Sequence, residues 1–143
     1  MISKASKIAS LSASWRGPSF WASAVGRRGG VAILCSQEYS DQVSAWHKDW
    51  NGRIVSFLVQ CDSVKLNLVN VYVPTVPAER KVFLQTVPSF FFPNSHPLTG
   101  GDLNCFDSLL DKMGGSGFFE FKLNQFQGFM WPPGCLALLS PAC

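Results

Sequence analysis

The order of the predicted elements indicates an α/β or α+β domain, and three observations support this fold class. Two consecutive segments, Ile54–Cys61 and Leu66–Val73, are rich in β-branched and aromatic residues and are separated by turn residues. Pro77–Val87 is a helical segment whose proline suits the first turn, because its missing N–H would be unpaired there in any case. A weaker strand, Leu98–Gly101, follows, so strands and a helix alternate along the chain.

The 143 residues divide into three parts, of which one is long enough to be a domain. We expect residues 1–14 to be an unstructured lead-in, because they hold lysines and serines but no acid and no strong apolar face. This composition resembles that of a transit peptide, which is the alternative interpretation. Residues 15–115 form the predicted domain. Residues 116–143 are an unassigned tail, either disordered or unrelated to the domain.

The remaining elements of the domain are short. Trp15–Trp21 is expected to be a loop or short edge segment, Val31–Ser36 a strand, and Gln37–Gly52 a polar connection that ends in an Asn-Gly turn. The two strands of the hairpin that follows do not alternate cleanly, so both of their faces should be covered. We expect Val31–Ser36 to be a neighbouring strand of this hairpin. A short helix is predicted over Ser108–Met113.

The composition excludes a disordered chain and permits an anionic partner. The chain is 47% hydrophobic and 15% charged, and its 12 Lys and Arg exceed its 9 Asp and Glu, which gives a net charge of +3. The densest basic clusters are only the pairs Arg27-Arg28 and Arg80-Lys81, a pattern typical of a solvated surface. No apolar run approaches the length of a membrane span, so no membrane partner is expected.

The five cysteines are odd in number and widely scattered: Cys35, Cys61, Cys105, Cys135 and Cys143. They form no C-x-x-C pair, and neither histidine lies at zinc-ligand spacing from a cysteine. We therefore expect reduced thiols without disulfide partners, in a reducing intracellular compartment, either nuclear or cytoplasmic.

Asp102 and Asn104 are the first candidates for chemistry, and they admit two interpretations. In an extended segment the two side chains project from one side of the backbone, and a carboxylate beside an amide suits the hydrolysis of a phosphodiester. The alternative is an ordinary Asx turn or helix cap after two glycines. Tyr72, at the end of a strand, could donate a hydrogen bond to a phosphate oxygen, or could simply pack its ring on a neighbour.

The combined blocks resemble the endonuclease domain of non-LTR (LINE-type) retrotransposons, within the exonuclease–endonuclease–phosphatase superfamily. The resemblance runs from about residue 15 to residue 115 and rests on the order of GRRGGVAILCS, WNGRIVSFLVQ, LNLVNVYVP, ERKVFLQTV, GGDLNC and LLDKMGG. It implies a partial two-sheet α/β sandwich, Mg²⁺ or Mn²⁺ as cofactor, and DNA as partner. It also implies that Tyr72 contacts a phosphate, that Asp102 orients or activates the water, and that Asn104 holds the phosphate in the transition state.

The chain departs from the family pattern at both ends. The asparagine and the metal-binding glutamate of the family's first strands have no counterpart, since Glu38 comes too late, and no histidine follows Asp102. The resemblance is therefore to a domain truncated at both ends. One aspartate alone holds Mg²⁺ poorly, so no metal ligand is assigned. We expect a remnant with little or no activity as a lone chain. Catalytic groups that act as a unit lose most of the activity when any one of them is missing.

Two alternatives to the inactive remnant stay open. One is an active enzyme whose missing groups come from another chain. The other is a non-enzymatic fold remnant that binds DNA weakly, or has no function. The basic residues that could bind DNA are Arg27, Arg28 and Arg53, together with Lys65.

Overall fold

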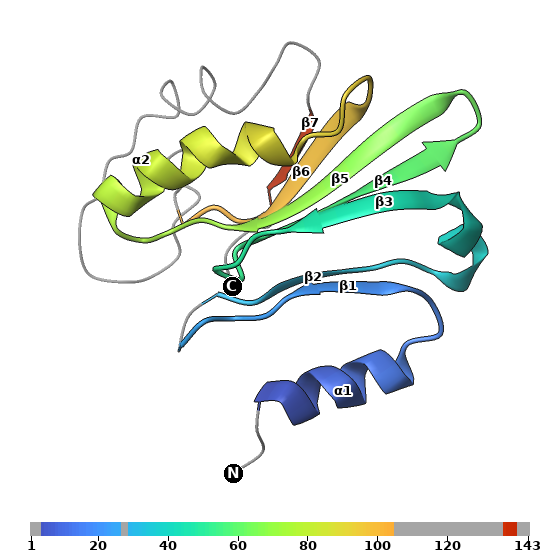
Figure 1. The fold of residues 1–143 in the computed structure, drawn as a ribbon, viewed down its shortest axis with the longest axis horizontal. Helices are drawn as coiled ribbons and strands as arrows, with labels where there is room; N and C mark the ends of the chain where they lie inside the picture. Colours follow the sequence, from blue (N-terminus) through green and yellow to red (C-terminus); the bar gives the residue numbers. More distant parts are fainter. Residues whose placement is uncertain (1–3, 27–28, 105–135, 140–143) are drawn as a thin grey trace.

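The computed structural model describes residues 4–26, 29–104 and 136–139, which form two β-sheets with helices beside them (Figure 1). In chain order the elements are α1 (Lys4–Ser14), β1 (Ser19–Ala22), β2 (Val31–Leu34), the 3₁₀ helix η1 (Gln37–Gln42), β3 (Val43–Lys48), β4 (Ile54–Cys61), β5 (Val64–Tyr72), α2 (Pro77–Thr86), the 3₁₀ helix η2 (Val87–Phe90), β6 (His96–Asp102) and β7 (Leu136–Leu139). The predicted α/β class is confirmed at this level.

The larger sheet has the strand order β3-β4-β5-β6-β7, and β1 and β2 form the smaller one. Strands β3, β4 and β5 pair antiparallel, and the pairs β5–β6 and β6–β7 are parallel. The predicted hairpin is confirmed, with Ile54 opposite Val71 and Cys61 opposite Val64. The chain passes from β5 to β6 through α2, since a parallel pair needs such a crossover.

The two faces of the larger sheet are covered by different layers. Helix α2 lies on one face, and the small sheet lies on the other with α1 beyond it (Figure 1). Ile54, Val71 and Val73 pack with Phe83 of α2 in one core. A second core joins Val55 to both strands of the small sheet. The prediction that both faces of the hairpin are covered is therefore confirmed.

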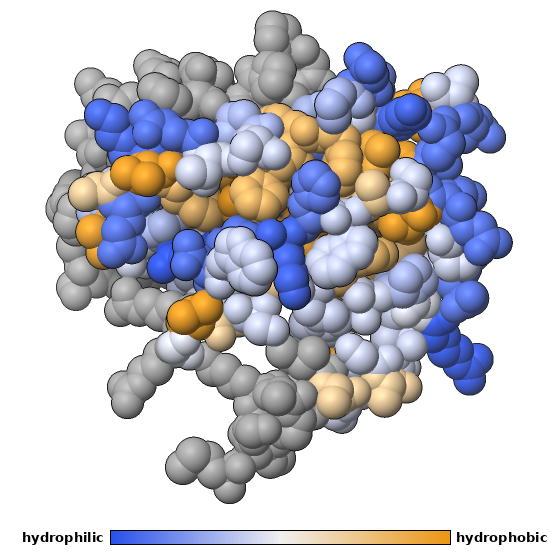
Figure 2. Space-filling view, viewed as in Figure 1, coloured by the Kyte–Doolittle hydropathy of each residue, from blue (hydrophilic) through white to orange (hydrophobic). Residues whose placement is uncertain are grey.

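Apolar side chains also reach the surface of this layered structure. Figure 2 shows them as a band across the side that presents α2 and the large sheet, with hydrophilic side chains along its borders. In the described part of the chain no helix is both long and apolar enough to cross a membrane. Cys35 and Cys61, the two cysteines in the described ranges, are free thiols.

Several sequence-based expectations were wrong. Residues 4–14 form α1 rather than an unstructured lead-in, because Ala, Lys and Leu favour helix even without a strong apolar face. Strand β2 pairs with β1 and not with the hairpin. The side-chain amide of Asn70 nevertheless ties the two sheets together by donating to the Ala32 carbonyl at 2.8 Å.

The polar connection and the tail also hold structure that the sequence did not reveal. Residues 37–52 contain η1 and β3, an edge strand whose side chains are mostly exposed. In the tail, Leu136–Leu139 forms β7 and pairs with β6. The predicted helix over Ser108–Met113 lies outside the described residues.

Candidate phosphate-binding site

The carboxyl ends of β5 and β6 bring together two of the predicted site residues. Tyr72 and Asp102 are direct partners in the parallel register of these strands. Neighbouring strands lie about 4.8 Å apart, and register partners face the same side of a sheet. Tyr72 is half-buried against the core between the two sheets, whereas Asp102 is exposed. Open α/β sheets bind ligands at this position, beyond the carboxyl ends of parallel strands.

Gly101 allows β6 to approach β5 closely enough for this pairing. Its φ is +129°, and a Cβ there would lie 2.0 Å from the Val71 carbonyl oxygen. The Val73 N–H then donates to the Asp102 carbonyl at 2.8 Å and extends the pairing past the strand end. The close neighbour of Gly101 is therefore strand β5.

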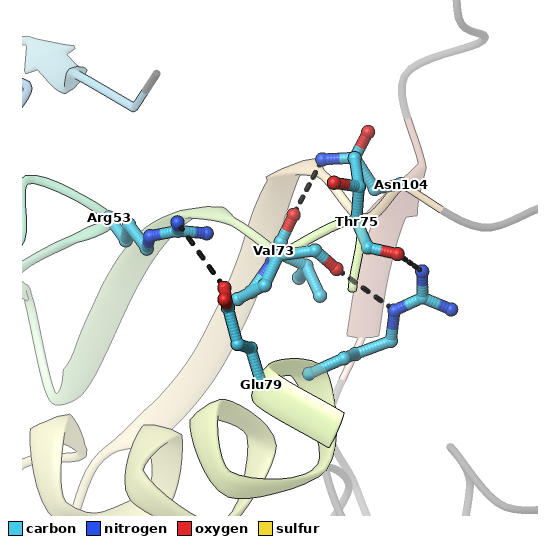
Figure 3. A network of polar contacts seen from close by, with 7 residues as sticks. Arg53, Val73, Thr75, Glu79 and Asn104 are labelled. Atoms are coloured by element: carbon cyan, nitrogen blue, oxygen red, sulfur yellow. Dashed lines mark hydrogen bonds and ion pairs between the residues drawn. The ribbon is translucent and has the colours of Figure 1, made fainter. Parts of the chain in front are cut away.

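Asn104 lies in a turn just beyond the end of β6. Its N–H donates to Oδ1 of Asp102 at 2.9 Å, and its φ is +48°, so residues 102–104 form an Asx turn. Its side-chain amide donates to the Val73 carbonyl at 2.5 Å (Figure 3). The turn interpretation is therefore confirmed, and the same turn gathers Asp102 and Asn104 beside Tyr72. One N–H of the Asn104 amide is already used within the protein.

Arg53 joins this group from the start of β4. Its guanidinium lies over the Tyr72 ring, 5.9 Å from the centroid. Nη2 is 3.9 Å from Oε2 of Glu79 in α2 (Figure 3), a long ion pair to an exposed carboxylate that is worth about 0–1 kcal/mol. Nη1 is buried and has no hydrogen-bond partner among the described residues. The Arg53 side chain is 21% exposed, so part of its positive charge remains accessible from solvent.

A buried arginine, Arg80, holds the loop between β5 and α2 in place. Arg80 donates from Nε to the Pro74 carbonyl at 3.0 Å and from Nη2 to the Thr75 carbonyl at 2.9 Å (Figure 3). These charge-assisted bonds satisfy carbonyls that follow the end of β5. The backbone beside Tyr72 is thereby fixed. Arg80 was expected to be a surface residue, and its burial shows that this interpretation was wrong.

The other residues considered in the sequence lie elsewhere. Lys65 is at the opposite end of β5 from Tyr72, so it does not contribute to this site. His96 begins β6, about 20 Å along the strand from Asp102, and His47 packs on the Phe92 ring at 4.5 Å. Arg27 and Arg28 lie outside the described residues.

The residues that could hold a metal ion are few in this region. Within residues 4–26, 29–104 and 136–139, no three Asp, Glu, His or Cys side chains lie close enough together to hold one. Asp102 is an exposed carboxylate, and one of its oxygens already accepts the Asn104 N–H. Mg²⁺ usually needs one or two carboxylates besides waters and phosphate. Asp102 supplies only one carboxylate, so these residues by themselves would hold only weakly the magnesium that the family resemblance implies.

A groove of about 940 Å³ leads away from Arg53, between the β3–β4 turn and α2. We call it the turn groove; it is lined by Lys48, Trp50, Arg53, Glu79 and Val82, among others. The sequence did not indicate Trp50 as a groove residue, because residues 37–52 were interpreted as a polar connection. It did not indicate Glu79 either, because residues 77–87 were interpreted only as a helix. An exposed tryptophan in an Asp-Trp-Asn-Gly-Arg turn is the signal that could have indicated the groove.

No protein-family model matches the chain, and no curated protein is significantly similar to it. Any functional assignment therefore depends on the arrangement of Tyr72, Asp102, Asn104 and Arg53.

Proposed function

We propose that the chain is a remnant of a phosphodiesterase of the retrotransposon-endonuclease kind, which binds DNA phosphates at these strand ends and does not cleave DNA as a lone chain. One observation carries the proposal: Tyr72 and Asp102 are register partners at the carboxyl ends of adjacent parallel strands, with Asn104 turned back beside them. The family resemblance selected these three residues from the sequence, without knowledge of the strand register.

The donors at the site are suited to a phosphate oxygen. The Tyr72 hydroxyl, at the end of β5, and the Arg53 guanidinium, just before the neighbouring strand β4, provide a neutral and a charged donor. The remaining N–H of the Asn104 amide is a third donor. Asp102 carries the only charge among these four residues that opposes a phosphate, and it lies at the exposed rim. Binding at this site should therefore be weak and should depend strongly on salt.

Phosphate binding, rather than metal-dependent cleavage, is the property we assign to these residues. Asp102 can accept a proton from water, but both described histidines lie away from it. Removal of one group that stabilises charge at phosphorus costs about a hundredfold or more in rate. Magnesium would be the cofactor only of a complete site of the family that the chain resembles.

Two measurements test the proposal. Supercoiled plasmid should stay intact with the wild-type chain and Mg²⁺, as it does with Asp102→Ala. Nicking by the wild type that Asp102→Ala abolishes would overturn the inactive assignment. In a gel shift at low salt, the wild type should retard a short duplex, and Arg53→Ala should weaken this binding, whereas Lys65→Ala should not.

Lys65 is a matched control because it is an exposed cation of the same sheet, at the far end from the site. Absence of a shift at low salt would dispose of the phosphate site. Equal weakening by Arg53→Ala and Lys65→Ala would indicate binding by general surface charge, which also contradicts the proposal. Circular dichroism of each variant verifies that the fold is retained.

A further inference from the structure

We infer that the β3–β4 turn presents Trp50 as a stacking platform for an unpaired base, so that the preferred ligand is single-stranded DNA. The inference rests on the proposed phosphate binding and adds the class of nucleic acid. It begins from the exposure of Trp50, which is 93% although tryptophan is usually among the more buried side chains.

The turn that carries Trp50 is held rigidly by Asp49. Its carboxylate accepts hydrogen bonds from three backbone N–H groups, those of Asn51 at 3.3 Å, Arg53 at 2.7 Å and Ile54 at 2.9 Å. The Asp49 N–H also donates to the Ile54 carbonyl at 3.1 Å. The exposure of Trp50 is therefore a property of an ordered turn and not of a frayed loop.

A second contact fixes the turn against the neighbouring β1–β2 connection. Gly52 has a φ of +69°, and a Cβ there would lie 2.0 Å from the Ser23 carbonyl oxygen. The Gly30 N–H donates to the Gly52 carbonyl at 2.6 Å. With its backbone held on both sides, the turn keeps Trp50 exposed and loses little backbone entropy when a ligand binds.

The charges around Trp50 favour a nucleic acid over an apolar protein segment. Lys48 and Arg53 line the turn groove together with Trp50. Of the two acids that also line it, Asp49 is occupied by backbone N–H groups and Glu79 faces Arg53. A base stacked on an aromatic ring, with cations along the phosphates, is the general arrangement of single-strand binding.

The groove also connects the platform to the phosphate site. Arg53 lines the groove and lies over the Tyr72 ring, only three residues after Trp50. A nucleotide whose base stacks on Trp50 would therefore direct its backbone toward Arg53. In a duplex both faces of a base are covered by its neighbours, so Trp50 can engage only an unpaired or terminal base.

Fluorescence anisotropy with labelled oligonucleotides of about 10 residues tests the inference. The full chain is titrated at low salt with oligothymidylate and with an abasic strand of the same length, which has the same phosphates but no bases. The wild type should bind oligothymidylate about tenfold more tightly than the abasic strand. Trp50→Ala should abolish this difference and leave abasic binding unchanged, and Trp50→Phe should retain it.

Tyr39→Ala is the matched control, because Tyr39 is an exposed aromatic residue that precedes β3 and lies away from the turn. If the wild type binds both strands equally while Arg53→Ala weakens both, the stacking inference is overturned and the phosphate site stands. If Trp50→Ala weakens both strands alike, stacking is also overturned. If neither strand binds at low salt, the proposed function fails as well.

Discussion

The side-chain amide of Asn67 donates a hydrogen bond to the Ser56 hydroxyl at 2.7 Å, and both residues are completely buried. The Ser56 hydroxyl donates in turn to the Phe90 carbonyl at 2.8 Å, and Asn67 Oδ1 accepts the Phe92 N–H at 3.1 Å. This network connects the central hairpin to the segment that follows α2. It satisfies polar groups that would otherwise be costly inside the core.

Asn67→Ala should lower the free energy of unfolding by about 2–4 kcal/mol, because it leaves the Phe92 N–H without its acceptor and opens a cavity. Urea unfolding followed by circular dichroism measures this loss. Asn51→Ala, at an exposed turn position, should change it by less than about 0.5 kcal/mol. Similar values for the two variants would contradict the role of the buried network.

Gly101→Ala should destabilise the protein by about 2 kcal/mol or more, because a Cβ collides with the Val71 carbonyl and the φ is unfavourable. Gly26→Ala separates the two effects. Gly26 also has a positive φ, +74°, but a Cβ there would meet no atom within 4 Å. Its cost should be about 1 kcal/mol. Equal losses of stability in the two variants would mean that the close approach of β6 to β5 adds nothing to the cost of the unfavourable φ.

Asp49→Ala should cost about 1–3 kcal/mol of stability, because three backbone N–H groups lose their acceptor. It should also speed amide hydrogen exchange at Arg53 and Ile54. Asp41→Ala, at an exposed position of η1, should leave both quantities nearly unchanged. Protection at Arg53 and Ile54 that persists in Asp49→Ala would show that the turn is held by other contacts.

Burial raises the pKa of the Cys35 thiol above its usual value of 9.0, and the nearby Cys61 and Glu38 raise it further. The reactive thiolate of Cys35 is therefore scarce at neutral pH. Alkylation followed by peptide mass spectrometry should label Cys35 more slowly than Cys61 at pH 8. Because its pKa is raised, the Cys35 rate should still increase as the pH passes 9. A Cys35 rate that levels off below pH 9 would contradict the raised pKa.

Local patterns in the sequence predicted the hairpin and α2 well. Ile54–Cys61 and Leu66–Val73 have strong strand composition, and Pro77 marks a helix start, so no distant contact was needed to recognise them. Strand β3 was missed because its side chains are mostly exposed and show no buried face. The pairing of β2 with β1 depends on tertiary packing, which short-range patterns do not encode.

The candidate site was predictable as a set of residues but not as an arrangement. The sequence indicated Tyr72, Asp102, Asn104 and Arg53, yet their proximity depends on the register of β5 with β6 and on the turn before β4. Lys65 was named with Arg53 as a possible DNA-binding residue, although the two residues lie at different ends of the sheet. Linear spacing says little about which end of a strand a cation occupies.

The crossover between β5 and β6 makes the candidate site sensitive to local unfolding of α2. Tyr72 and Asp102 are thirty positions apart in sequence and become neighbours only when α2 has docked, whereas the hairpin closes through a tight local turn. Partial unfolding that releases α2 would separate the two residues and leave the hairpin paired. A limited proteolytic cut within α2 should therefore abolish the proposed DNA binding before the antiparallel strands separate.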